Sequence, residues 1–164
     1  MAGTGFALAP APTRTIIGPL QTEGGLRYWY LVCSSESIIA IRQGFWTGIL
    51  LTYLSGKFPE MYLYSALTLL FGLLNKYAKR RRLQIEAKIL NLPASTLRMK
   101  PNRVFEIWLL RSIALKGFGF GLITPDITLE TINGSKQTFG ILKADFEEAC
   151  PQLEVLYPSL CKRK

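Results

Sequence analysis

The stretch ITLETINGSKQTFGI, residues 127–141, decides the fold of the second half of this chain. Apolar and polar residues alternate with period two from Ile127 to Ile132, as in a strand with one buried face. Asn133-Gly134 follows, which is the strongest short signal for a tight hairpin turn, and Lys136 to Ile141 returns as the partner strand. The sequence therefore predicts an antiparallel hairpin, and with it an antiparallel sheet.

A closing helix is predicted directly after this hairpin, from Lys143 to Leu156. Apolar residues recur there at helical spacing, which gives the segment one apolar face. Pro151 limits or restarts the helix, because proline has no backbone N–H to donate. Ahead of the hairpin, Val104–Leu110 and Ile113–Gly121 are strand candidates. The charged residues 161–164 at the other end are expected to be frayed.

An earlier hairpin is predicted over residues 26–43. Tyr28–Cys33 and Ile38–Arg42 are short runs rich in aromatic and β-branched residues, and four polar residues separate them. The alternative is that Ile38 already begins a membrane helix, because the apolar character continues to Leu54. Residues 1–25 are expected to form a flexible N-terminal tail.

Residues 44–77 are predicted to form a helical hairpin in a membrane. Gly44–Ser55 and Met61–Leu74 are apolar, and Gly56–Glu60 between them holds the Gly and Pro that end helices. Each segment is shorter than the roughly 20 residues that span a bilayer, so the hairpin is either transmembrane or re-entrant. The alternative is a buried helical pair inside a soluble domain.

Positive charge flanks this apolar segment and makes its flanks the candidate binding site for anionic lipid headgroups or an acidic partner. By the positive-inside bias, both termini and the β-rich residues 78–164 are expected on the cytoplasmic side of an integral membrane protein. Juxtamembrane cations gain about 1 kcal/mol each near an anionic leaflet. A role in topology alone is the alternative, and nucleic acid is disfavoured because the cluster abuts apolar residues. The candidate residues are Arg42, Lys76, Lys79, Arg80, Arg81 and Arg82.

Composition agrees with a membrane setting. Hydrophobic residues make up 49% of the chain and charged residues only 19%, and the mean hydropathy is +0.20. This is more apolar than a water-soluble domain usually needs. The net charge of +9 favours polyanionic partners, which are nucleic acids or anionic phospholipid surfaces.

No catalytic, cofactor-binding or metal-binding pattern is visible. The chain has no histidine, and its three cysteines are widely spaced without a CxxC pair, which disfavours zinc sites, disulfide frameworks and histidine-based catalysis. Gly117–Gly121 is rich in glycine, but neither a helix start nor a Lys-Ser/Thr pair follows it, as a phosphate loop requires. The sequence therefore predicts a protein that is not an enzyme.

The order of these elements resembles bacterial pleckstrin-homology-like (PH-like) membrane proteins, particularly the YcxB-like type, in which a helical pair is inserted among the strands. The likeness lies in Trp29–Arg42, Phe105–Ile113, the hairpin at 127–141 and the helix near Phe146–Ala149. The resemblance implies an α+β membrane protein whose antiparallel sheet or partial barrel is closed by a C-terminal amphipathic helix. It implies a non-catalytic binding or scaffold module and transfers no catalytic residue.

A second class of function is an accessory subunit of a larger membrane complex. In that case the hairpin packs on helices of other membrane proteins, or of further copies in a homo-oligomer. Small residues permit such close approach of helices. They are Gly44, Gly48, Ser65, Ala66 and Gly72.

Overall fold

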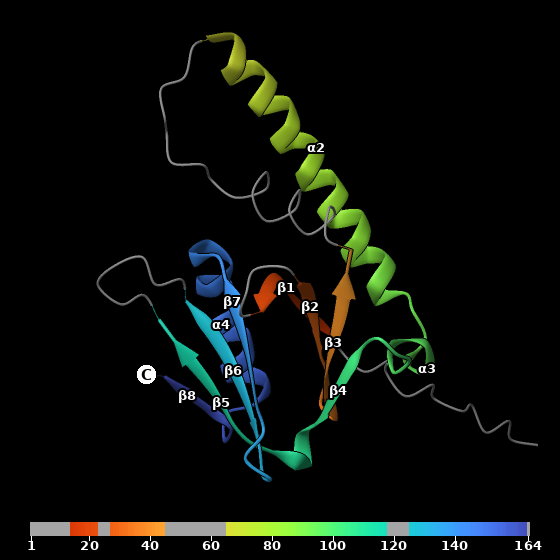
Figure 1. Ribbon diagram of the computed structural model, residues 1–164, viewed down its shortest axis with the longest axis vertical. Coiled ribbons are helices and arrows are strands. Elements are labelled where there is room, and N and C mark those ends of the chain that lie inside the picture. The colour runs from red at the N-terminus through yellow and green to blue at the C-terminus, as the bar shows by residue number, and fades with distance from the viewer. Residues whose placement is uncertain (1–13, 23–26, 45–64, 118–124, 164) are drawn as a thin grey trace, which may run out of the picture.

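The computed structural model describes residues 14–22, 27–44, 65–117 and 125–163, and it shows one eight-stranded sheet with helices on both faces (Figure 1). The strand order is β4-β3-β2-β1-β7-β6-β5-β8, and only β8 runs parallel to its neighbour. The strands are β1 (Thr15–Thr22), β2 (Tyr28–Cys33), β3 (Ser37–Gln43), β4 (Arg103–Glu106), β5 (Leu110–Lys116), β6 (Asp126–Thr131), β7 (Lys136–Ile141) and β8 (Cys161–Arg163). The helices are α2 (Ser65–Leu90), α3 (Ala94–Leu97), α4 (Lys143–Leu156) and the 3₁₀ turn η1 (Ile107–Leu109).

The sheet consists of two antiparallel meanders. Strands β1 to β4 pair one after another, β5 to β7 do the same, and the two groups join where β1 pairs with β7. Both predicted hairpins are confirmed, β2–β3 and β6–β7, the second with Gly134 at positive φ in its turn. The α+β class with a C-terminal helix is therefore confirmed.

The main core lies inside a curled sheet. Buried side chains from both meanders meet there, and Ala149, Leu153 and Tyr157 of the α4 region pack against them. Arg103 on β4 hydrogen-bonds to Gln137 on β7, although the two strands are four places apart in the sheet. At about 4.8 Å per strand, a flat sheet would separate them by about 19 Å. The sheet is thus open, with edges at β4 and β8, but strongly curved.

A second core covers the outer face of the first meander. Tyr30 and Val32 of β2, together with Ile39 and Ile41 of β3, pack against α2 and α3. Their neighbours along the strands, such as Leu31, point into the main core. All six residues of β2 are therefore buried. This double burial explains why β2 reads as a continuous apolar run and not as an alternating one.

The expected N-terminal tail over residues 1–25 is wrong for its second half, because Thr15–Thr22 form β1. Ile17 and Leu20 of this strand are buried in the main core. The period-two signal is interrupted at Gly18-Pro19, where the register of β1 against β2 shifts. A bulge of this kind adds a residue to one strand and breaks the alternation that sequence reading depends on. Residues 1–13 and 23–26 lie outside the described residues.

Two expectations in the second half also need correction. The expected strand Val104–Leu110 is split, because η1 follows β4 and leaves Trp108 75% exposed. The tail expected to fray begins with β8, which pairs with β5, and the Ile113 N–H donates to the Leu160 carbonyl at 2.8 Å. Three residues with two cations give no strand signal of their own. The edge of β5 supplies the hydrogen bonds that order them.

Helix α2 runs without a break from Ser65 to Leu90, across the boundary expected at residue 77 and through all five cations of the cluster. Of the predicted membrane hairpin, Gly44 directly follows β3, residues 45–64 lie outside the described residues, and the rest belongs to α2. No helix among the described residues has both the length and the apolarity to cross a membrane.

Gly18 is a position at which only glycine fits. Its φ is +146°, and a Cβ there would lie 2.8 Å from Cδ1 of Tyr30 and 3.1 Å from the Trp29 carbonyl oxygen. We expect Gly18→Ala to lower the free energy of unfolding by about 2 to 4 kcal/mol. Gly117→Ala is the matched control, because a Cβ there meets no atom within 4 Å. Urea unfolding measures both changes, and equal effects would contradict the packing described for β1.

Candidate functional site

One side of α2 lies on the sheet. Ala78, Arg82, Ile85 and Ile89 follow each other at the spacing of a single helix face, and each is buried or half-buried. Ile89 is 4% exposed and packs into the core over β2 and β3. This face is why the C-terminal half of α2 docks on the sheet. The N-terminal half runs beyond the sheet (Figure 1).

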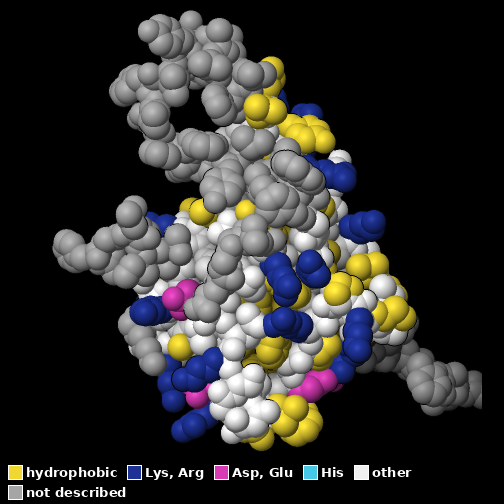
Figure 2. All heavy atoms as spheres, viewed as in Figure 1, with side chains coloured by type: hydrophobic (Ala, Val, Ile, Leu, Met, Phe, Trp, Pro, Cys, Tyr) yellow, Lys and Arg dark blue, Asp and Glu magenta, His cyan; other side chains and the backbone are white. Residues whose placement is uncertain are grey.

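The opposite side of α2 mixes cations with large apolar side chains. Leu73, Tyr77 and Leu83 are 68%, 57% and 66% exposed. Figure 2 shows dark blue and yellow side chains next to each other along this helix. The exposed cations between them are Lys76, Lys79, Arg80 and Arg81. We call these seven residues the outer face of α2.

The four cations of the outer face are exposed. Within the described part of the chain, none of them forms an ion pair. Arg81 donates a 3.4 Å hydrogen bond from Nη1 to Oε1 of Gln84 on the same helix. The structure therefore leaves these four residues of the predicted cluster exposed along one helix.

Arg82 belongs to the same run of sequence but points the other way. Its Nε donates to Oε1 of Glu86 at 2.8 Å, and its Nη1 donates to Oδ1 of Asp145 on α4 at 2.8 Å. Its Nη2 donates to the carbonyl oxygen of Gly18 on β1 at 2.6 Å. The side chains of Arg82 and Asp145 are only 23% and 12% exposed. Arg82 is therefore a link between three elements of the fold.

The bulge in β1 explains why this link forms. Strand β1 pairs with β7 only from Leu20 onward, so the Gly18 carbonyl lies outside that ladder. The guanidinium of Arg82 supplies its hydrogen bond. Burial alone would lower the pKa of Arg82, but Glu86 and Asp145 outweigh burial and raise it. The guanidinium stays charged, and two carboxylates face it in a partly dry site.

Arg42 is separated from the other candidate residues. It lies exposed near the end of β3, and its backbone N–H donates to Oδ1 of Asn102 at 3.3 Å. Successive strand residues point to opposite faces, so Arg42 lies on the face away from Ile41, which packs toward α2. The structure therefore leaves four of the six predicted residues exposed along α2, places Arg82 inside the fold and leaves Arg42 elsewhere.

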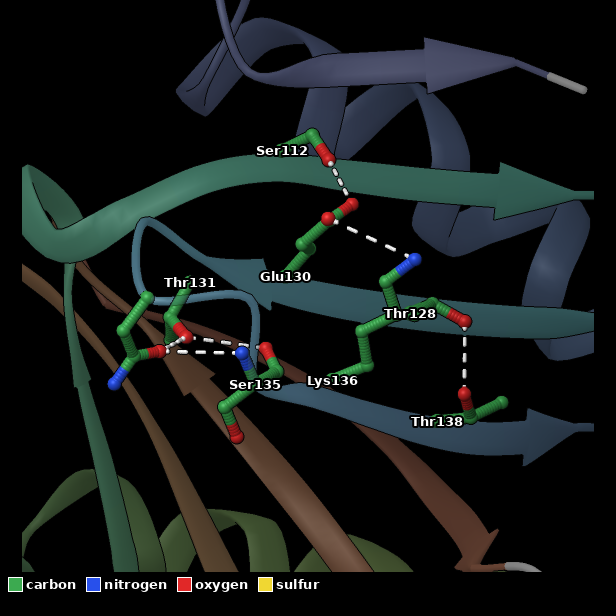
Figure 3. A network of polar contacts seen from close by, with 8 residues as sticks. Ser112, Thr128, Glu130, Thr131, Ser135, Lys136 and Thr138 are labelled. Atoms are coloured by element: carbon green, nitrogen blue, oxygen red, sulfur yellow. Dashed lines mark hydrogen bonds and ion pairs between the residues drawn. The ribbon is translucent and has the colours of Figure 1, made fainter.

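The solvent face of the second meander offers a contrast, because its polar groups pair with one another (Figure 3). Thr128 and Thr138 share a hydrogen bond of 3.0 Å. Ser112 donates to Glu130 at 3.3 Å, and Lys136 lies 3.7 Å from the same carboxylate. Charge on this face is balanced locally, whereas the outer face of α2 carries cations alone.

Other groups with possible chemistry are the thiols of Cys33, which is buried, and Cys161, which is half-buried. Burial raises the pKa of Cys33 to about 12, and burial followed by the charge of Glu154 raises the pKa of Cys161 to about 11. Both thiols are protonated at neutral pH, whereas nucleophilic cysteines depend on the thiolate. Among the described residues, no three His, Cys, Asp or Glu side chains gather in a way that could hold a metal ion.

Replacing Arg82 is expected to destabilise the fold, unlike replacing Arg80. Arg82→Gln leaves the Asp145 carboxylate without its cation and the Gly18 carbonyl without its donor, which costs about 2 kcal/mol or more in the free energy of unfolding. Arg80→Gln removes the same charge from the outer face and should change stability by less than about 0.5 kcal/mol. Chemical unfolding of both variants checks this. Equal stabilities would contradict the Arg82 network.

Cys161 is expected to alkylate slowly although it is partly exposed. Its pKa of about 11, against an ordinary 9.0, lowers the thiolate fraction at pH 8 by about 100-fold. Iodoacetamide labelling, read by mass spectrometry, should therefore accelerate by about tenfold per pH unit between pH 8 and pH 10. The same chain unfolded in urea is the control. Labelling of the folded chain as fast as the unfolded chain would contradict the burial of this thiol.

Comparison with known proteins adds no relative from which a function could be transferred. No protein-family model matches the chain, and no curated protein and no solved structure match it.

Proposed function

We propose that the protein is a membrane-anchored, non-catalytic binding or scaffold module with a PH-like fold, which contacts anionic lipid headgroups at the cytoplasmic face of a membrane. One observation carries this proposal. The outer face of α2 presents four cations without an ion pair in the described residues, next to Leu73, Tyr77 and Leu83. The same side chains suit an anionic surface with an apolar interior beneath it.

The energetic argument rests on the two kinds of side chain together. Each Lys or Arg near an anionic leaflet gains about 1 kcal/mol, which falls off within a Debye length. Exposed apolar side chains on the same side of a helix gain by entering the boundary between headgroups and acyl chains. The long stems of Lys76 and Arg80 allow their charges to reach the headgroups from a helix that lies at this depth.

Two features of the fold support the PH-like part of the proposal. The curled antiparallel sheet carries a C-terminal helix on its core, as the resemblance implies. A long helical insertion, which contains α2 and α3, separates β3 from β4. In the PH-like membrane proteins that the sequence resembles, a helical pair is likewise inserted among the strands.

The membrane anchor is assigned to residues 44–77. Within this segment, residues 65–74 read SALTLLFGLL and contain no charge. They belong to the half of α2 that runs beyond the sheet (Figure 1). In this arrangement the hairpin enters the bilayer as a transmembrane or re-entrant pair, and the cations of the outer face meet the headgroups on the cytoplasmic side.

An accessory subunit of a larger membrane complex is the second candidate. The observation that favours it is the exposure of Leu73, Tyr77 and Leu83, which offer an apolar strip to a partner helix. The two candidates differ in what the cations contact. A lipid-binding module responds to headgroup charge by itself, whereas a subunit co-purifies in stoichiometric amounts with other membrane proteins.

The test measures lipid preference of the full-length chain in uncharged detergent micelles. The readout is the affinity for fluorescent phosphatidylglycerol compared with phosphatidylcholine, at low and high salt. The wild type should prefer phosphatidylglycerol, and salt should weaken that preference. The variant Lys76→Gln, Lys79→Gln, Arg80→Gln and Arg81→Gln should lose at least about tenfold in affinity for phosphatidylglycerol, since four charges are removed.

The matched control removes four exposed cations from other elements, by changing Lys100, Arg111, Lys116 and Lys162 to Gln. Its net charge equals that of the α2 variant, so only the location of the charges differs. The control should keep the preference for phosphatidylglycerol. Equal affinity of the wild type for both lipids, or an equal loss in the control, would refute lipid binding by the outer face. Membrane fractionation tests the anchor separately, because recovery of the chain in the soluble fraction without detergent would refute it.

A further inference from the structure

We propose that Arg82 is a positioning residue, which fixes the rotation of α2 on the sheet so that the outer face points away from the protein. This inference rests on the proposed function of the outer face. The five cations between Lys76 and Arg82 then have two different roles. Lys76, Lys79, Arg80 and Arg81 contact the anionic surface, whereas Arg82 contacts only the protein.

The geometry of the guanidinium carries the first step. Nε is bonded to Glu86 on α2 itself, Nη1 to Asp145 on α4, and Nη2 to the Gly18 carbonyl on β1, at distances of 2.6 to 2.8 Å. The guanidinium is planar and its N–H donors point in fixed directions, so it forms all of its hydrogen bonds only over a narrow range of orientations. Because α4 and β1 belong to the body of the fold, the helix cannot rotate without breaking two of these bonds.

The place of Arg82 along α2 carries the second step. Ile85 and Ile89 hold the C-terminal part of the helix in the core over β2 and β3. Between residues 73 and 81, the fully buried side chain of α2 is that of Ala78, whose methyl group gives little directional hold. Arg82 is thus the hydrogen-bonded anchor near the C-terminal end of the outer face, between Arg81 and Leu83. At about 100° per residue, Arg80 lies about 200° around the helix from Arg82, so fixing one inward turns the other outward.

The sign of the charge effect makes the proposal testable. Asp145→Asn removes a negative charge, so simple electrostatics predicts tighter binding to phosphatidylglycerol. Loss of the Arg82 network predicts the opposite, because α2 loses its fixed rotation. Arg82→Lys keeps the charge and loses the fork, so simple electrostatics predicts no change. Both variants should instead weaken binding of the full-length chain, on the order of fivefold.

The matched control is Glu147→Gln, which removes a carboxylate on the same helix. Glu147 is exposed, and its nearest cation is Lys143 at 3.9 Å. Its affinity for phosphatidylglycerol should equal or exceed that of the wild type. A second readout is hydrogen exchange of the α2 amides between residues 79 and 84 without lipid. Exchange there should accelerate in Asp145→Asn and Arg82→Lys but not in Glu147→Gln.

The outcomes separate this proposal from the proposed function. The positioning role would be overturned if Asp145→Asn and Arg82→Lys bound phosphatidylglycerol as tightly as Glu147→Gln does. It would also be overturned if the α2 amides of both variants exchanged as slowly as those of the wild type. A wild type without preference for phosphatidylglycerol would overturn the lipid-binding function instead, and the hydrogen-exchange comparison would still decide whether Arg82 fixes α2. Circular dichroism confirms that each variant is folded before either comparison.

Discussion

Strands β2 and β3 bury both of their faces, and the positions of the other elements depend on this constraint. Their inner side chains need the second meander and α4, which the curl of the sheet brings to them. Their outer side chains need a cover, which the insertion between β3 and β4 supplies through α2 and α3. The insertion is therefore part of the folded core and not a loop added to a finished domain. Burial of about 25 cal/mol per Å² of apolar surface makes this cover favourable.

The ion network of Arg82 lies where α2, β1 and α4 approach one another. Apolar packing holds the helix on the sheet without a strong preference for its rotation, whereas hydrogen bonds have direction. The hydrogen bonds of Arg82 lie at the end of the apolar contact between α2 and the sheet. They fix the rotation of a helix whose N-terminal half runs beyond the sheet. Within a single run of five cations, the period of the helix turns Arg82 inward and leaves the other four exposed.

Much of the fold could be predicted from the sequence where local chemistry is strong. The Asn133-Gly134 turn and the helical period of α4 each act within a few residues, and both were found in the structure as expected. Strand β1 was missed because its bulge at Gly18 hides the alternation. Strand β8 was missed because its order comes from β5. The clustered cations lie on α2, but only the spacing from Ala78 to Ile89 separates Arg82 from the others. That spacing becomes informative once one continuous helix is known.

The central claim is that the outer face of α2 meets the membrane, and the most direct measurement is the depth of labels in membranes that contain the full-length chain. A fluorophore at Tyr77→Cys should be quenched strongly by quenchers attached to lipid. A fluorophore at Trp108→Cys should be quenched weakly, because η1, which connects β4 and β5, lies at the far end of the sheet from the start of α2 (Figure 1). Equal quenching at both positions, or stronger quenching at Trp108→Cys, would contradict the account.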